Sequence, residues 1–102
     1  MNLRTYLDQG QPLLFDGSMG TYFASLPGHG QDRCERANLE HPEDILSIHK
    51  TYLEAGCKAI KTNTFSLGSD LGGEDEALDI AMLQAACRLA KEAAVPYQAF
   101  VF

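Results

Sequence analysis

Three short apolar runs mark this chain, and each run is bounded by polar or turn-forming residues. They cover Leu13 to Asp16, Ala59 to Thr62 and Gln98 to Phe102. Runs of this length and composition predict buried strands. Apolar side chains at helical spacing lie between them, so the pattern predicts the order β, α, β, α, β. Right-handed crossovers would make the neighbouring strands parallel and place the helices outside them.

Two long helices are expected between the strands. The first begins at Pro42, a residue suited to the first helical position, and ends before Gly56, which suits the left-handed residue after the last turn. The second covers Glu76 to Ala94 and is stopped by Pro96. The prediction is completed by a short helix over Leu3 to Asp8, a short segment over Met19 to Leu26, and loops over 27–32 and 66–75.

Composition narrows the class of protein. The chain has 102 residues, of which 45% are apolar and 22% charged, so we expect one globular core. Its formal charge of −6 and its calculated pI near 4.8 argue against a nucleic-acid-binding surface. No run approaches the ~20 apolar residues of a membrane span, and the first residues lack the apolar segment of a secretory signal. We therefore expect a cytoplasmic protein with no membrane partner.

The spacing of the cysteines and histidines gives no metal or disulfide pattern. Cys34, Cys57 and Cys87 are odd in number, far apart and outside any CxxC motif, so neither a disulfide framework nor a self-contained zinc site is predicted. Cys57 and Cys87 are interpreted as small apolar packing residues. Neither His41 nor His49 has a partner at ligand spacing. We interpret His41 as a residue that begins a helix and His49 as a satisfied imidazole at a helix interface.

Candidate chemistry begins at the end of the first predicted strand. Asp16 follows three apolar residues, so its carboxylate is expected at the carboxyl end of the strand, where barrel enzymes bind substrates. There it either holds the ammonium group of a ligand or only organises the turn, since Asp before Gly is a common turn pair. The backbone N–H groups of residues 17–21 would lie close to the same point, and such turns bind carboxylates or phosphates.

The second predicted strand also ends in a polar cluster, which consists of Thr62, Asn63, Thr64 and Phe65. This cluster either shares a pocket with Asp16, as neighbouring parallel strands would require, or only caps the next loop. Glu35 and Asn38 precede the first long helix. They reach the mouth of the pocket or fix the loop through side-chain hydrogen bonds, and we favour the second interpretation.

Three motifs in this order carry a family resemblance. They are the DG-x-MGT turn at Asp16 to Thr21, the helix NL-x-x-P-x-x-x-x-x-x-H-x-x-Y-x-x-AG at Asn38 to Gly56, and the strand end TNTF at Thr62 to Phe65. Together they resemble the amino-terminal part of the homocysteine S-methyltransferase family, over nearly all of the chain from Leu14 to about Ala94. The residues of these segments are most similar to those of bacterial members of the family, including members fused to a methylenetetrahydrofolate reductase.

The resemblance implies a fold, a reaction and a set of binding residues. It implies an α/β protein in which residues 1–102 are the amino-terminal portion of a (βα)8 TIM barrel, about two and a half βα units. Such a barrel binds homocysteine as a zinc thiolate and transfers a methyl group to its sulfur. Carried over by position, Asp16 would bind the homocysteine ammonium group, and Gly17 and Ser18 would donate backbone hydrogen bonds to its carboxylate. The side chains implied to line the same pocket are Thr62, Asn63, Thr64 and Phe65.

The metal half of such a site has no counterpart here. The family's zinc is held by three cysteines on later strands, two of them adjacent, and this chain has no adjacent cysteine pair. We therefore expect a fragment that by itself neither retains zinc nor methylates homocysteine. The methyl donor is left open by the sequence. Two alternatives from other classes also stay open: a non-catalytic binding or assembly module whose last strand pairs with another chain, and an unrelated barrel enzyme that binds an anion at the turn after Asp16.

Overall fold

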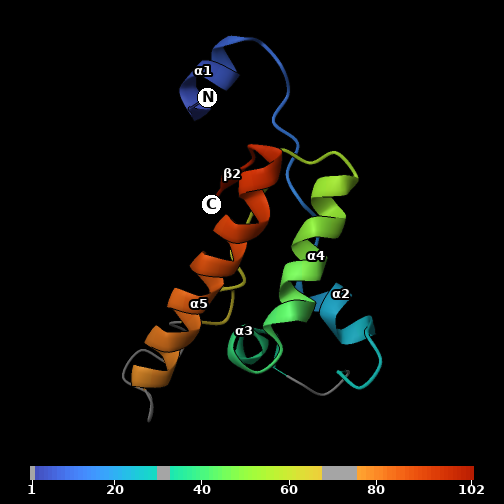
Figure 1. Cartoon of the computed structure of the whole chain (residues 1–102), viewed down its shortest axis with the longest axis vertical. Coiled ribbons are helices and arrows are strands. Elements are labelled where there is room, and N and C mark those ends of the chain that lie inside the picture. Colours follow the sequence, from blue (N-terminus) through green and yellow to red (C-terminus); the bar gives the residue numbers. More distant parts are fainter. Residues whose placement is uncertain (1, 30–32, 68–75) are drawn as a thin grey trace.

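The computed structural model describes residues 2–29, 33–67 and 76–102. Its central feature is a set of three parallel chain segments behind two long helices, α4 (Pro42–Glu54) and α5 (Glu76–Ala94), which lie beside each other (Figure 1). Helix α1 (Leu3–Asp8) lies at one end of the molecule, beyond an extended connection (Figure 1). Parallel strands joined through helices are the arrangement of an α/β protein, as the sequence predicted.

Strand β1 (Ala59–Ile60) is the middle one of the three parallel segments. On one side it pairs with β2 (Phe100–Val101), with Ala59 opposite Phe100. On the other side Ala59 forms a single parallel bridge with Phe15. The Asp16 N–H donates to the Ala59 carbonyl at 2.9 Å, which fixes the register of the first segment against β1. The carboxyl ends of all three segments therefore meet at one edge.

All three strands are shorter than the sequence predicted. The first is reduced to the bridge at Phe15, because the Lys58 and Ala59 N–H groups both donate to the Leu14 carbonyl and the regular ladder stops there. The third begins only at Phe100, because Gln98 adopts a left-handed conformation with φ of 52°. A strand residue needs extended dihedral angles, so such a conformation ends the pairing.

The predicted helices agree closely with the observed ones. α1, α4 and α5 have the expected ranges within one residue, and Gly56 has the left-handed φ of 112° expected after the last turn of α4. Helix α2 (Gly20–Ser25) lies inside the short segment expected at 19–26. Three short elements were not predicted: the 3₁₀ turn η1 (Cys34–Arg36), helix α3 (Ala37–Glu40) and the 3₁₀ turn η2 (Val95–Tyr97). The predicted loops at 27–32 and 66–75 lie partly outside the described residues.

The core lies between α4, α5 and the strands. Ile45 and Ile48 on α4 are buried against Phe23 of α2 and Leu89 of α5. Further along, Leu53 packs with Ile60 and with the alanines at the end of α5. Small side chains on α5 let the two helices approach closely, while the branched side chains of α4 fill the space between the layers.

Asn38 ties three distant parts of the fold together. Its side chain is fully buried, and its Nδ2 donates to the Asn63 carbonyl at 3.0 Å and to the Met82 carbonyl at 3.2 Å. Its Oδ1 accepts a hydrogen bond from Asn63 Nδ2 at 2.9 Å. These bonds hold α3 against α5 and against the end of β1. They support the loop-fixing interpretation of Asn38 and explain why a four-residue helix forms where the sequence shows no helical pattern.

His49 differs from its sequence interpretation. It is completely buried on α4, as expected for an interfacial residue, but neither ring nitrogen has a hydrogen-bond partner among the described residues. Burial lowers the pKa of His49, and the negative charge of Asp16 opposes that shift. Burial therefore favours the neutral imidazole, and its ring nitrogens find no hydrogen-bond partner within the described part of the chain.

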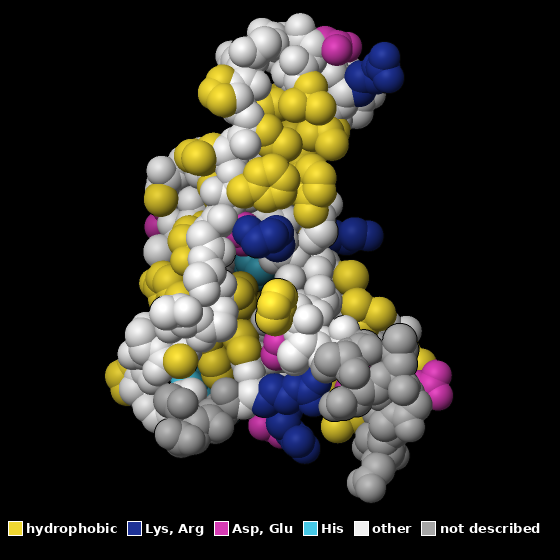
Figure 2. All heavy atoms as spheres, turned by 180° about the vertical axis from the view of Figure 1, so that it is seen from behind, with side chains coloured by type: hydrophobic (Ala, Val, Ile, Leu, Met, Phe, Trp, Pro, Cys, Tyr) yellow, Lys and Arg dark blue, Asp and Glu magenta, His cyan; other side chains and the backbone are white. Residues whose placement is uncertain are grey.

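The face of the strands turned away from the helices is open. Figure 2, seen from behind, shows apolar side chains gathered there above a group of Lys and Arg side chains. Leu14, Phe15 and Phe102 are 60%, 41% and 48% exposed, and the rings of Phe15 and Phe102 lie 4.9 Å apart. Within the described residues, no helix combines the length and the hydropathy needed to cross a bilayer.

We predict that Asn38→Ala lowers the free energy of unfolding by about 3 kcal/mol, because it leaves buried polar groups without partners. Leu39→Ala is the matched control, since the neighbouring side chain is 40% exposed and makes no buried polar contact; it should cost about 1 kcal/mol or less. Urea denaturation of both variants measures the difference. Equal losses would contradict the role assigned to Asn38.

Candidate functional site

The residues that follow the first two strands surround one cavity of about 980 Å³. One wall is the turn after the first strand, and the opposite wall follows β1. Cys34, Glu35 and Phe102 complete the lining. The wall residues are Asp16, Gly17, Ser18, Met19, Gly20 and Thr21 on one side, and Lys61, Thr62, Asn63, Thr64 and Phe65 on the other. A second hollow of about 520 Å³ lies over α4 and α5 and includes none of these strand-end residues.

Asp16 is one of two acidic residues with little exposed surface that line this cavity, and Glu35 is the other. The Asp16 side chain is only 2% exposed, and its Oδ2 accepts a hydrogen bond from the Lys61 backbone N–H at 3.2 Å. The Lys61 ammonium group pairs with Asp16 Oδ1 and also donates to the Asp16 carbonyl at 3.1 Å. The carboxylate therefore already binds one ammonium group, and a nearly buried carboxylate requires such a partner. Sequence reasoning missed Lys61, although it immediately precedes the TNTF cluster.

The turn after Asp16 is held in place by Tyr52, which lies on α4. The Tyr52 hydroxyl donates to the Ser18 carbonyl at 2.7 Å, and the Thr21 N–H donates to Ser18 Oγ at 3.2 Å. A Cβ atom added to Gly17 would lie 2.8 Å from the Tyr52 hydroxyl oxygen. Among the described residues, the N–H groups of Gly17 and Ser18 donate no hydrogen bond. These two donors therefore stand unused at the wall of the cavity.

The hydroxyl groups and the ring of the TNTF segment differ in their exposure. Thr62 Oγ1 and Thr64 Oγ1 lie 2.9 Å apart and share one hydrogen bond. The Thr64 N–H donates to the Thr62 carbonyl at 2.9 Å, which turns the chain sharply after β1. Phe65 is fully exposed, so its ring lies at the rim of the cavity and is not packed against protein.

Asn63 lines the cavity, but its side chain forms hydrogen bonds with other residues of the protein. Its Nδ2 donates to the Cys34 carbonyl at 2.9 Å as well as to Asn38, and its Oδ1 accepts from Cys34 Sγ at 3.3 Å. The amide is thus fully satisfied by η1 and α3. Its position supports the loop-capping interpretation for this one residue of the cluster.

Glu35 and Cys34 form the third side of the cavity. Glu35 is buried, and its Oε1 accepts a hydrogen bond from the Ser66 N–H at 3.1 Å, so it fixes the chain after TNTF and also faces the cavity. Burial raises the pKa of the Cys34 thiol to about 11; the neighbouring Glu35 charge adds to this rise, and the hydrogen bond to Asn63 opposes it. Cys34 is therefore a protonated, weakly nucleophilic thiol at neutral pH.

The three cysteines do not form a zinc site. Cys34 is bonded to Asn63, Cys57 is buried in the core beside Leu53, and Cys87 lies on α5. Burial also raises the pKa of the Cys57 thiol, which disfavours the thiolate that zinc requires. No cysteine belongs to a potential metal-binding group within the described part of the chain.

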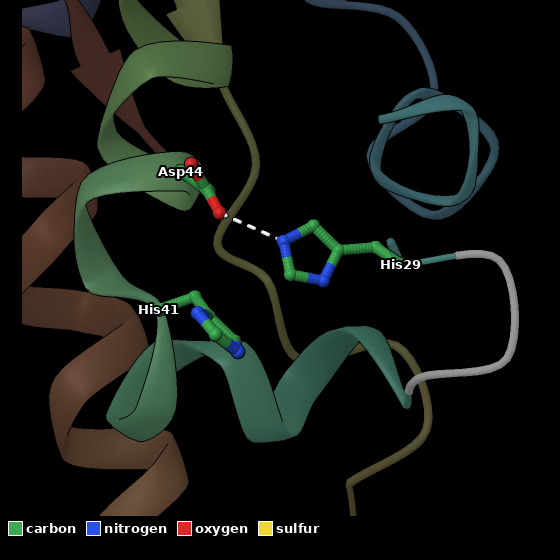
Figure 3. A group of neighbouring side chains, drawn as sticks. All are labelled: His29, His41 and Asp44. Atoms are coloured by element: carbon green, nitrogen blue, oxygen red, sulfur yellow. Dashed lines mark hydrogen bonds and ion pairs between the residues drawn. The ribbon is translucent and has the colours of Figure 1, made fainter. Parts of the chain in front are cut away.

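One group of side chains that could bind a metal ion was not predicted from the sequence. His29, His41 and Asp44 come together at the start of α4 (Figure 3), and none of the three lines the cavity. His41 begins the helix, as predicted. Its partner His29 is distant in the sequence, so spacing alone gives no signal for the group.

The comparisons with known proteins agree with the motifs. The family model described as homocysteine S-methyltransferase matches residues 13–102. The methionine synthase of Mycobacterium tuberculosis (strain ATCC 25618 / H37Rv) is 37% identical over 67 residues, which cover 59% of this chain and 6% of that protein. The chain thus spans only a small part of the length of this relative.

Gly17→Ala should destabilise the protein by about 1–3 kcal/mol, because the added methyl group overlaps Tyr52 and the ring must leave the Ser18 carbonyl. Gly20→Ala provides the control, because a Cβ there meets nothing within 4 Å; it should change stability by about 0.5 kcal/mol or less. Thermal denaturation of the two variants tests this, and a neutral Gly17→Ala would refute the close contact.

Cys34 should resist alkylation until the pH approaches its raised pKa of about 11. Glu35→Gln removes a negative charge that disfavours the thiolate, so the pKa falls and alkylation at pH 9 becomes faster; Gln also retains an oxygen that can accept from Ser66. Iodoacetamide labelling followed by peptide mass spectrometry measures the rate, with Cys87 as the internal reference. A slower or unchanged rate in Glu35→Gln would contradict this electrostatic account.

Proposed function

Because this chain belongs to the homocysteine S-methyltransferase family, we propose that its cavity binds the amino-acid end of homocysteine for methyl transfer to the sulfur. Residues 1–102 would then form the amino-terminal portion of a (βα)8 barrel domain. The observation that carries the proposal is the juxtaposition, in one cavity, of a nearly buried carboxylate and two backbone N–H groups that donate to no described residue. These are the complementary groups for an ammonium and a carboxylate held on one carbon atom.

Asp16 takes the ammonium group of the substrate. Its carboxylate lies at the end of the first strand and already pairs with the Lys61 ammonium, and this pairing supports an ammonium group as its ligand. In the complex the substrate ammonium replaces Lys61 at Oδ1. Lys61 is free to leave because its side chain is 53% exposed, whereas Asp16 stays fixed by the Lys61 backbone N–H.

Gly17 and Ser18 take the carboxylate of the substrate through their N–H groups. Charged acceptors strengthen such bonds. The turn is held by the Tyr52 hydroxyl, so the donors need little rearrangement when the ligand arrives. The close approach of Tyr52 leaves no room for a Cβ atom at position 17, which also lines the cavity.

The TNTF segment forms the opposite wall. Thr62 and Thr64 supply hydroxyl groups, and the exposed ring of Phe65 closes the rim over an apolar substrate chain. Asn63 contributes indirectly, since its bonds to Cys34 and Asn38 hold this wall in position.

Zinc, which would convert the substrate thiol into a nucleophilic thiolate in the complete domain, does not fit the cysteines of this chain. We propose that the zinc ligands and the contacts to the methyl donor would be supplied by other parts of such a complete domain. By this proposal the chain alone has part of the amino-acid pocket and no methyltransferase activity.

The central test uses two ligands that differ only in the amino group, L-homocysteine and 4-mercaptobutyrate. Asp16→Asn should weaken homocysteine binding about tenfold or more, because a charge-assisted hydrogen bond contributes about 1.5–3 kcal/mol. It should change 4-mercaptobutyrate binding by about twofold or less. Isothermal titration measures both constants. Equal losses for the two ligands, or tight binding of inorganic phosphate without homocysteine binding, would overturn the assignment.

Lys61→Met is the matched variant for Asp16→Asn, and we expect it to strengthen homocysteine binding where Asp16→Asn weakens it. It removes the ammonium group that competes for Asp16, so homocysteine should bind more tightly while 4-mercaptobutyrate is unaffected. Weaker homocysteine binding in Lys61→Met would contradict the replacement of Lys61 by the substrate.

A further inference from the structure

Three side chains outside the cavity converge from two segments of the chain. His29 follows α2, His41 is the residue that begins α4, and Asp44 lies in the first turn of that helix. One potential ligand atom from each lies within 4.8 Å of the other two. Figure 3 shows the two imidazole rings and the carboxylate grouped around a common space between the loop and the helix. All three side chains are partly exposed, so an ion can reach them from solvent.

The orientation of His29 is fixed by its neighbours. Its ring stacks on Phe23, with 4.5 Å between ring centroids and 19° between planes, and Phe23 is itself buried. The His29 side chain is only 12% exposed, and its Nε2 lies 2.9 Å from Asp44 Oδ2. The rings of His29 and His41 lie edge to face, with 4.6 Å between their centroids. A ligand atom held in this way loses little conformational freedom when a metal binds.

Two imidazoles and one carboxylate are a familiar donor set for metals. Zinc is bound by two histidines and one carboxylate in several enzymes, and non-haem iron(II) uses the same three ligand types. We propose that His29, His41 and Asp44 bind one divalent transition-metal ion, with zinc as the probe. Nothing in this donor set involves a thiol or the cavity of Asp16, so the site is separate from any zinc that activates homocysteine.

The distances between the three potential ligand atoms are close to those of a zinc site, so the side chains need to move only a little to bind an ion. In a tetrahedral zinc site, ligand atoms about 2.0–2.1 Å from the metal lie about 3.3 Å from each other. The His29 and Asp44 ligand atoms are already 2.9 Å apart, and the outer limit of the group is 4.8 Å. Rotation of the partly exposed His41 ring closes the remaining gap. A water molecule would take the fourth position, as in open three-ligand sites.

The surrounding charge is compatible with a cation. The positive end of the α4 dipole opposes it, but Glu43 and Asp44 both lie in that first turn and offset the dipole. The chain as a whole carries a formal charge of −6. Binding would tie the loop after α2 to the start of α4. It would also change the sequence-based expectation that the isolated chain retains no zinc.

The test titrates zinc into the protein in competition with a chromophoric chelator. We expect one ion per chain, and at least about tenfold weaker binding in Asp44→Asn and in His41→Gln, since even outer-shell partners of a metal site contribute that much. Glu43→Gln is the matched control, because it removes an adjacent carboxylate that is not in the group; its affinity should fall by no more than about twofold. Absence of binding, or equal losses in Glu43→Gln and Asp44→Asn, would overturn the proposal.

Two measurements on the unaltered chain do not depend on the folding of variants. Zinc should shift the imidazole nitrogen resonances of His29 and His41 and leave those of the buried His49 unchanged. Cobalt(II) should give the visible spectrum of nitrogen and oxygen ligation without a thiolate charge-transfer band. A thiolate band, or unshifted His29 and His41 resonances at saturation, would place the ion elsewhere and refute the site.

Discussion

The parallel pairing of the segment around Phe15 with β1 is the constraint on which the rest of the site depends. The Asp16 N–H bonded to the Ala59 carbonyl sets the register, and the Lys61 N–H bonded to the Asp16 carboxylate continues it beyond the last strand residue. A slip by one residue would turn Asp16 to the other face of the sheet. This register therefore brings together two polar clusters that are more than forty residues apart in the chain.

Around that register, structural and binding roles are divided between neighbouring residues. Asn63 and Asn38 use their amides to join the end of β1 to α3 and α5, and Tyr52 supports the turn from α4. Their bonds are made within the protein. Asp16 and the Gly17 turn face the cavity with groups that a ligand can use. The stability of the first set maintains the geometry of the second, which is the usual relation between a scaffold and a binding site.

The sequence predicted what local chemistry controls and missed what distant contacts control. The bounds of α4 followed from Pro42 and Gly56, and the α/β order followed from the spacing of apolar runs. Helix α3 was missed because buried bonds made by Asn38 hold it. The satisfied state expected for His49 was wrong, since no described residue bonds to its ring nitrogens, and its position on α4 gives no sign of this in the sequence. The Lys61 pairing with Asp16 and the grouping of His29 with Asp44 arise only when separate segments meet.

The most direct measurement is a crystal structure of the protein with L-homocysteine bound. Our account predicts that the ligand nitrogen lies about 3 Å from the Asp16 carboxylate, with the ligand carboxylate at a similar distance from the Gly17 and Ser18 nitrogens. The Lys61 side chain should have moved toward solvent. A ligand bound in another place, or one whose ammonium group points away from Asp16, would contradict the account.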